Sequence, residues 1–419
     1  MNRRDAIRGL TWSTALLGLP ATAASNDVKP LPEKTLFDEH PESFWNQLRD
    51  EQFVLPDKRV FLNTGSLGVA PKPVLKTISD YIERAAALTT EEHYPRWGYE
   101  SLDEYREELS QFVGCRKDEL AIVHNTTEAM SIIAGGMPLN RGDEVLITDQ
   151  EHPSGRAPWE LRQAKSEITL REVAIPLTPD SPEQLVDTVI SAIGPKTRVL
   201  SFSGITSPTG LIMPIREICI AAREKDVITV VDGAHMTGQL RFRIDELHCD
   251  YFASSPHKWL FAPAGSGLLY ISEDRLDDHN PVIVTEGWDD KSLKASRFMR
   301  LGTNNRAIIE GMMAGLRFAR AIGHDRIYER MHELSKQVYA RVSELPFISM
   351  YTPKDDRFFA SMVTFHIKLS ERQFDKFWMR CDERSIFTTR YPHLRISTHI
   401  HTRQSDLDLF FDTLQEAAR

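Results

Sequence analysis

The chain has 419 residues, of which 41% are hydrophobic and 26% charged, and its formal net charge is −9. A chain of this length can bury a large core, most readily in two domains or in one large domain with a smaller one beside it. The acidic balance provides no basic surface of the kind that binds nucleic acid, so we expect no nucleic-acid partner.

The first residues have the pattern of an export signal. Arg3 and Arg4 precede an apolar stretch, residues 9–20, and small residues follow it at 21–24. This order is typical of a signal peptide, and the adjacent arginines indicate the twin-arginine type. We therefore expect residues 1–23 to be read by the twin-arginine translocase and the protein to be periplasmic or otherwise exported, with a cytoplasmic location as the alternative. The apolar run is too short to span a bilayer, so no stable membrane anchor is expected.

Neither a metal site nor a disulfide framework is predicted. The four cysteines are widely spaced and form no CxxC pair, which argues against both. His399 and His401 stand two residues apart, but such a pair is more often part of a polar surface than a metal site.

Beyond the signal, three segments differ in their pattern. Residues 24–75 are polar and contain several prolines, which predicts an N-terminal arm with one short helix near residues 42–49 and a strand at 60–63. Residues 76–310 are expected to form a large domain. Residues 311–419 are expected to form a small α+β domain, with short strands at 362–365 and 394–397.

From residue 120 onward, strand-like and helix-like runs alternate. Apolar runs predict strands at 121–123, 144–148, 199–202, 227–231 and 267–271. Apolar residues at three- and four-residue spacing predict helices at 72–87, 100–113, 127–134, 158–164, 215–224 and within 306–343. Alternation of this kind is typical of an α/β fold whose mostly parallel central sheet is flanked by helices.

An acid and a lysine follow two of these strands. Asp232 ends the run 227–231, and Lys258 lies just beyond the strand-like run 250–253. Pyridoxal phosphate (PLP) needs a lysine for a Schiff base and a carboxylate beside its ring nitrogen. This pair therefore predicts a PLP site, with Lys258 and Asp232 as catalytic residues.

Other polar loops follow strands of the same predicted sheet. Thr126 and Thr127 stand at the start of the helix expected at 127–134, where Thr127 is expected to be the N-cap and the free N–H groups to hold phosphate. His152 follows the strand 144–148, at the edge where open α/β sheets bind ligands. Ser255 and His257 flank Lys258 with two further donors for a phosphate.

These motifs resemble those of the aminotransferase class V superfamily, a group of fold-type I PLP enzymes, and in particular its isopenicillin N epimerase-like branch. The resemblance rests on Asp232-Gly-Ala-His235, on Ser255-Pro-His-Lys258, on the Gly-Thr segment at Thr303 and on the Arg-x-Ser-x-His segment that begins at Arg395. It implies a large PLP-binding domain, a smaller C-terminal domain and a homodimer.

The resemblance also implies roles for individual residues. His152 would stack on the cofactor ring and take part in catalysis, and His235 would contact the phenolic oxygen. Thr303 would reach the phosphate of the neighbouring subunit's cofactor, and Arg395 would clamp a substrate carboxylate. The expected cofactor-binding residues are Thr126, Thr127, His152, Asp232, His235, Ser255, His257, Lys258 and Thr303. Arg395, Asn63 and Ser207 are the expected substrate-binding residues.

The expected function is a PLP-dependent enzyme that acts through Lys258 at the Cα of an amino acid or amino-acid moiety, in the manner of an epimerase or aminotransferase. A C–S lyase or desulfurase-like activity is one alternative, although the stretch 385–393 lacks the cysteine that desulfurases carry before the arginine segment. A non-catalytic exported protein on the same fold is the other.

Overall fold

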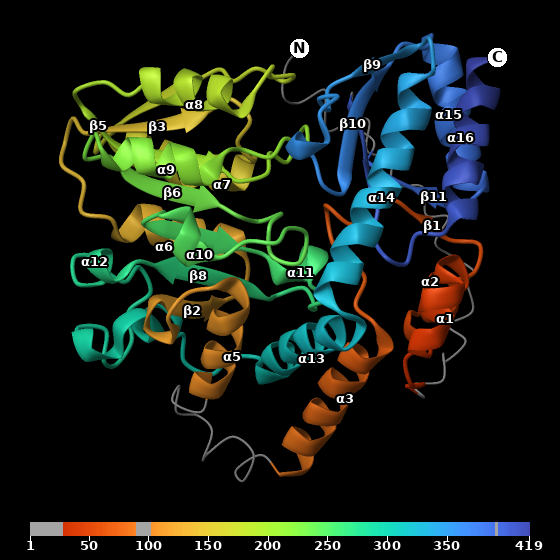
Figure 1. Ribbon diagram of the computed structural model, residues 1–419. Coiled ribbons are helices and arrows are strands. Elements are labelled where there is room, and N and C mark those ends of the chain that lie inside the picture. Colours follow the sequence, from red (N-terminus) through yellow and green to blue (C-terminus); the bar gives the residue numbers. More distant parts are fainter. Residues whose placement is uncertain (1–27, 89–101, 390–392) are drawn as a thin grey trace.

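The computed structural model describes residues 28–88, 102–389 and 393–419, in which a large and a small domain lie side by side (Figure 1). The large domain is built on a seven-stranded sheet with the strand order β2-β8-β7-β6-β5-β3-β4. Its strands are β2 (Leu120–Val123), β3 (Glu144–Thr148), β4 (Thr169–Val173), β5 (Thr197–Ser203), β6 (Ile228–Asp232), β7 (Tyr251–Ser254) and β8 (Gly267–Ile271). All neighbouring strands run parallel except β8, which is antiparallel to both β2 and β7. The predicted fold class is confirmed.

Helices flank this sheet, so several of its strands are buried throughout. Every residue of β2, β7 and β8 is buried, as expected for strands covered on both faces. Figure 1 shows α9 and α10 in front of the sheet and α6 behind it. The helices that follow the strands of this sheet are α6 (Thr126–Gly136), α7 (Pro153–Ala164), α8 (Pro182–Ser191), α9 (Ile215–Arg223), α10 (Ile244–Leu247), α11 (Pro256–Trp259) and α12 (Glu273–Leu276).

The small domain contains an antiparallel sheet of order β12-β10-β9, formed by His393–Ser397, Met362–Ile367 and Ile348–Met350. Three helices accompany it: α14 (His324–Ser343), α15 (Glu371–Glu383) and α16 (Gln404–Ala418). A separate parallel pair joins β1 (Val60–Phe61) to β11 (Ile386–Phe387). The small domain therefore takes one strand from the N-terminal part of the chain.

The division between the two cores lies farther along the chain than the predicted boundary at residue 310. That boundary falls inside α13 (Arg306–Ile322), whose buried apolar residues belong to the core of the large domain. Along α14, Met331 still packs in that core, whereas Leu334 begins the core of the small domain. We therefore place the division within α14, because a continuous helix carries the chain from one core to the other.

The predicted N-terminal arm packs into both domains. Its helices α1 (Lys34–Glu39) and α2 (Pro41–Gln52) are followed by β1, then by α3 (Lys72–Ala87), which packs on α13. Phe44 and Leu48 of α2 lie in the large core, whereas Val60 and Leu62 lie in the small one. The next helix that the structure describes is α5 (Asp103–Val113). Three 3-10 helices lie in the irregular segments between longer elements: η3 (Lys117–Glu119), η4 (Lys291–Met299) and η5 (Asp356–Phe358).

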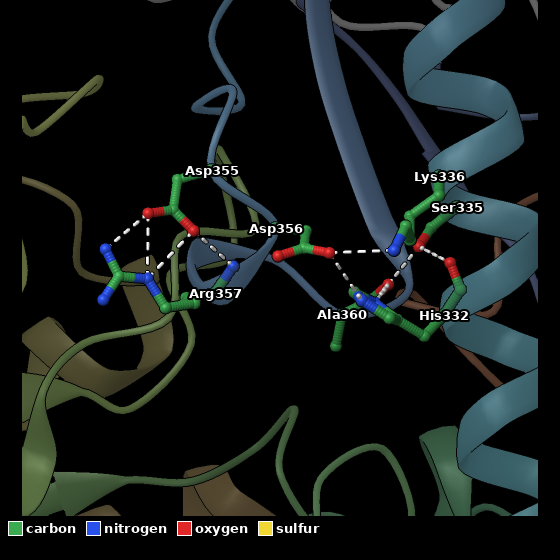
Figure 2. A network of polar contacts seen from close by, with 7 residues as sticks. All are labelled: His332, Ser335, Lys336, Asp355, Asp356, Arg357 and Ala360. Atoms are coloured by element: carbon green, nitrogen blue, oxygen red, sulfur yellow. Dashed lines mark hydrogen bonds and ion pairs between the residues drawn. The ribbon is translucent and has the colours of Figure 1, made fainter.

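A polar network fixes the loop between β9 and β10 to α14 (Figure 2). Lys336 donates to the Asp356 carboxylate at 2.8 Å, and His332 lies 3.8 Å from the same carboxylate. The backbone of this loop also reaches the large domain, because the Ile212 N–H donates to the Phe358 carbonyl at 2.9 Å. The loop thereby connects α14 of the small domain to the segment after β5.

The expected export signal at residues 1–23 lies outside the described residues. Among the residues that are described, no helix is long and apolar enough to cross a membrane.

Candidate active site

A cavity of about 630 Å³ lies at the carboxyl ends of the central strands, and loops of the small domain complete it. Six of the residues predicted as cofactor-binding line it from the large domain on the loops after β2, β3 and β7: Thr126, Thr127, His152, Ser255, His257 and Lys258. Asp232 and His235 line it from the end of β6, Ser207 from the loop after β5 and Arg395 from β12. The tertiary structure thus gathers residues from both domains around one space.

Lys258 projects into this cavity from the four-residue helix α11. Its Nζ lies 3.1 Å from His235 Nε2. The pKa of Lys258 is lowered to about 8, chiefly by burial; the charge of Asp232 opposes the shift and that of Arg395 adds to it. An amine with this pKa is partly uncharged near neutral pH, as a nucleophile or a base requires.

Asp232 is the last residue of β6 and is buried beneath the cavity. Its Oδ1 accepts the Ala234 N–H at 3.0 Å. Burial raises the pKa of Asp232, while that backbone donor and the charge of Lys258 lower it. Gly155 of α7 makes room for the carboxylate, because a Cβ at this position would lie 2.8 Å from Asp232 Oδ2.

Hydroxyl groups gather at the N-terminus of α6. The Thr126 and Ser255 hydroxyls lie 2.8 Å apart, and the Thr126 N–H donates to Ser255 Oγ at 3.1 Å. The predicted N-cap, Thr127, is wrong: Asn125 is the cap, and its side chain accepts the Glu128 N–H at 2.9 Å. Because Asn125 takes the capping role, Thr127 stands in the first turn of α6 and is exposed in the cavity.

Hydrogen bonds to neighbouring groups determine which ring nitrogen is protonated in two of the histidines. His257 Nδ1 lies 3.0 Å from the Ser266 carbonyl and therefore donates to it, which leaves Nε2 as an acceptor in the neutral ring. His152 caps α7, and its Nδ1 accepts the Ser154 N–H at 3.1 Å. Burial lowers the pKa of both rings. Both are therefore favoured in the neutral form.

Arg395 is buried in β12 and holds its guanidinium across the cavity. Its Nη1 donates to the Ser207 carbonyl at 2.7 Å and to the Ser207 hydroxyl at 3.2 Å, and its Nη2 donates to the Ser66 hydroxyl at 3.2 Å. A Cβ on Gly65 would lie 3.1 Å from Nη2, so the glycine permits this close approach. These contacts orient the planar fork of donors that carboxylates favour.

Two predicted residues do not line the cavity. Asn63 is buried behind it and accepts the Ser66 hydroxyl at 2.9 Å, so it supports a partner of Arg395. Thr303 lies between η4 and α13 and is exposed. Its predicted contact with a neighbouring subunit stays a prediction.

Glu151 is the residue of this region that the sequence motifs did not single out. Its carboxylate accepts hydrogen bonds from the Thr148 hydroxyl at 2.5 Å, from the Ser203 N–H at 3.1 Å and from the Ser203 hydroxyl at 2.7 Å. Burial raises the pKa of Glu151 to about 7, against these three donors and together with the charge of Asp232. The sequence signal that could have identified Glu151 is its position after the strand expected at 144–148 and directly before His152.

The chemistry of these groups fits pyridoxal phosphate. Phosphate needs several donors, and the first turn of α6 supplies N–H groups and hydroxyls beside Ser255. A protonated pyridine nitrogen needs a buried carboxylate, which Asp232 provides, and an aldehyde needs an amine of lowered pKa, which Lys258 provides. His152 and Arg395 lie around the same cavity. Among the described residues, no cluster of ligands suited to a metal ion occurs.

Comparison with known proteins assigns the family. The sequence matches the aminotransferase class V family over residues 60–389. The chain belongs to this family. Isopenicillin N epimerase of Amycolatopsis lactamdurans is 30% identical over 398 residues, which cover 90% of this chain and 99% of the relative. The isopenicillin N epimerase of Streptomyces clavuligerus is 28% identical and covers 88% of this chain and 97% of the relative.

A solved structure agrees with this family fold. The complex between the cystine C–S lyase C-DES and its reaction product cysteine persulfide superposes with a TM-score of 0.76 at 23% identity, over 85% of this chain and 97% of that one. The family predicted from the motifs is confirmed, and the chain is a PLP-dependent enzyme of the aminotransferase class V type.

The raised pKa of Glu151 predicts a pH-dependent loss of stability. The carboxyl holds its proton more tightly in the folded chain, with a pKa of about 7, than at the ordinary value of 4.5. The free energy of unfolding should therefore fall as pH rises through this interval. Glu151→Gln cannot titrate, so its stability relative to the wild type should increase by ~1–3 kcal/mol across the same interval.

Urea unfolding of cofactor-free protein at a series of pH values measures this difference. Glu160→Gln, which alters an exposed acid of α7, the helix that begins two residues after Glu151, is the matched control and should follow the wild-type curve. Parallel curves for the wild type and Glu151→Gln would contradict the assignment.

Proposed function

We propose that the protein is a PLP-dependent enzyme that moves a proton at the Cα of an amino acid, or of an amino-acid moiety with a free carboxylate, in the manner of an epimerase. The observation that carries the proposal is the convergence of Lys258, Asp232 and Arg395 on one cavity. The similarity to two isopenicillin N epimerases over nearly their whole length supports this branch of the family.

Each residue has a definite part in this reaction. When bound, pyridoxal phosphate supplies an electron sink that stabilises negative charge at the substrate Cα. Asp232 holds a proton on the pyridine nitrogen, because a buried carboxylate is best stabilised by a positive partner. Lys258 takes the proton from Cα, for which its lowered pKa suits it. Arg395 binds the carboxylate and so fixes which bond at Cα faces Lys258.

The atom and the face to which the proton returns decide which of the possible reactions takes place. Epimerisation requires delivery to the opposite face of Cα, whereas transamination requires delivery to the cofactor. Ser66, Thr389 and His393 line the cavity on the side of Arg395 and are the candidates for a second proton carrier. Of these, only His393 titrates near neutral pH in the unperturbed state.

A C–S lyase activity is the second candidate, supported by the fold of the cystine C–S lyase C-DES. A desulfurase mechanism through a persulfide on the enzyme is disfavoured, because none of the four cysteines lines the cavity. Cys219, Cys249 and Cys381 are buried, and burial raises the pKa of Cys115 to about 12, so that its thiolate is scarce.

The test is a panel of free L- and D-amino acids, of isopenicillin N and of peptides with a free amino-acid moiety, incubated with the PLP-loaded protein in D2O. Exchange of the Cα proton, followed by NMR, reports the proposed step, and chiral analysis reports epimerisation. Keto-acid release would indicate transamination instead, and release of sulfide or persulfide from cystine would favour the lyase. No exchange with any member, together with an unchanged cofactor spectrum, would favour a non-catalytic exported protein.

Removal of the carboxylate clamp should separate substrate binding from cofactor binding. Arg395→Ala is expected to weaken substrate binding by ~2–3 kcal/mol, a rise in KM of roughly a hundredfold, because a charged hydrogen-bonding partner is lost. The visible absorbance of the bound cofactor should persist. Arg384→Ala, which removes an arginine of the small domain that pairs with Glu416, is the matched control. Loss of the cofactor in Arg395→Ala alone would show that the clamp assignment is wrong.

We also propose a homodimer. Thr303 is exposed and does not line the cavity of its own chain, so a phosphate contact by Thr303 requires a second subunit. An exposed apolar segment that contains Val282, Ile283, Val284 and Trp288 lies nearby in the sequence and provides surface for association. Light scattering coupled to gel filtration should give twice the mass of the chain, and a monomer that retains the cofactor would refute the role of Thr303.

Export by the twin-arginine translocase is proposed from the pattern at residues 1–23. A folded, cofactor-loaded protein is the type of cargo for which this route is suited. Cell fractionation of the wild type and of the Arg3→Lys, Arg4→Lys double variant tests it, and equal distribution of both in the cytoplasm would favour the alternative location.

A further inference from the structure

A line of four hydrogen bonds runs from the end of β12 to Lys258. The Ile400 N–H donates to His399 Nδ1 at 2.8 Å, and His399 Nε2 lies 3.1 Å from the Trp259 carbonyl. The Trp259 indole N–H donates to His235 Nδ1 at 3.3 Å, and His235 Nε2 lies 3.1 Å from Lys258 Nζ. His399, Trp259 and His235 are all buried. The line therefore connects the small domain to the reacting amine through groups shielded from water.

The indole determines which nitrogen of His235 carries the proton. An indole N–H is a donor only, so His235 Nδ1 must accept, and a neutral ring then has its proton on Nε2. His235 is neutral because burial holds its pKa well below the ordinary value. The Nε2–H therefore points to Lys258 Nζ, which accepts this bond only as an uncharged amine, since an ammonium group has no lone pair.

Trp259 itself is held from two sides. The His399 ring stacks on the indole with ring centroids 6.0 Å apart and an interplanar angle of 17°, while its Nε2–H donates to the Trp259 carbonyl. On the other side, Gly238 has a φ of +93°, and a Cβ there would lie 2.5 Å from the Trp259 carbonyl carbon. The backbone of Trp259 is thus enclosed by Gly238, and its indole is held by the His399 ring as well as by its hydrogen bond.

We propose that Trp259 is a positioning residue: its indole N–H locks His235 in the tautomer that offers a donor, and not a lone pair, to the amine of Lys258. The proposal rests on the role of Lys258 proposed above, and it adds a hydrogen bond that favours the uncharged form of this amine. Through His399, the small domain also contacts Trp259 directly.

Other charged groups act on the same pair and must stay constant in a test. Asp232 and Arg395 act on Lys258 with opposite signs. Lys258, Arg395, His152 and His257 act on His235. Replacing Trp259 alters none of these charges, so a change in the titration of Lys258 would come from the hydrogen bond or from packing.

Trp259→Phe separates the hydrogen bond from the packing. Phenylalanine keeps an aromatic ring beside His399 but donates no hydrogen bond, so His235 becomes free to carry its proton on Nδ1. His235 Nε2 can then accept from the Lys258 ammonium group, and the pKa of Lys258 should rise by roughly one unit. The pKa is measured on cofactor-free protein from the pH dependence of reductive methylation of Lys258, read by mass spectrometry of its peptide.

The tautomer is read directly from the ¹⁵N shifts of histidine-labelled, cofactor-free protein, with His235→Gln to assign the resonance. The wild type should show a protonated Nε2 and an unprotonated Nδ1, and Trp259→Phe should lose this single tautomer. Trp159→Phe is the matched control, because Trp159 is also fully buried in the large domain and donates to Ser201 at 3.1 Å away from Lys258. It should change neither the tautomer nor the pKa of Lys258.

In a His235→Gln background, Trp259→Phe should have no further effect on the pKa of Lys258, which distinguishes the tautomer lock from a packing effect. An unchanged tautomer and pKa in Trp259→Phe, or equal shifts in both backgrounds, would overturn the proposal. If Trp259→Phe does not fold, a wild-type spectrum with the proton on Nδ1 overturns it as well. Because these measurements need neither cofactor nor substrate, they stand apart from a failure of the proposed reaction.

Discussion

The chemistry of this protein depends on a lysine amine that is surrounded by protein and whose pKa is lowered to about 8, so that part of it is uncharged near neutral pH. Burial supplies the largest effect on Lys258, and Arg395 adds to it, while Asp232 opposes both. The arrangement is physically consistent because each charged group has another partner: Asp232 accepts a backbone N–H, and Arg395 donates to Ser207 and Ser66. Without these partners, the acid and the arginine would each carry the full cost of desolvation.

The two-domain architecture follows from the same requirement. The carboxyl ends of parallel strands supply Asp232, His152 and Lys258, because loops after such strands meet at one edge of a sheet. The carboxylate clamp comes from β12 of the small domain, so the cavity exists only when both domains are in place. β1 and α14 connect the two cores, which makes the position of Arg395 relative to Lys258 a property of the whole chain.

Buried polar groups around the site are organised by donors and acceptors of fixed direction. Ser203 presents its N–H and hydroxyl to Glu151, Ser266 accepts from His257, and Trp259 donates to His235. Such contacts set proton positions before any ligand arrives, which reduces the reorganisation that a reaction requires. Close packing has the same effect at Gly155, where the Asp232 carboxylate leaves no space for a side chain.

The sequence by itself determined the family, the parallel α/β sheet and most of the cavity's residues, because strand-end motifs and apolar periodicity are local properties. The helix predicted at residues 72–87 coincides with α3 (Lys72–Ala87). The strand β4 was missed because it lies at the sheet edge and carries Arg171 and Glu172, so it lacks an apolar run. Only the tertiary structure decided that Asn125 caps α6, that Glu151 lies near Asp232, that the cores divide within α14 and that Trp259 contacts His235. The last three depend on which side chains meet across elements distant in the sequence, and no local pattern encodes that. The Asn125 cap is a local contact with Glu128, but Asn and Thr are both good caps, and only the folded backbone decides which of them stands at the cap position.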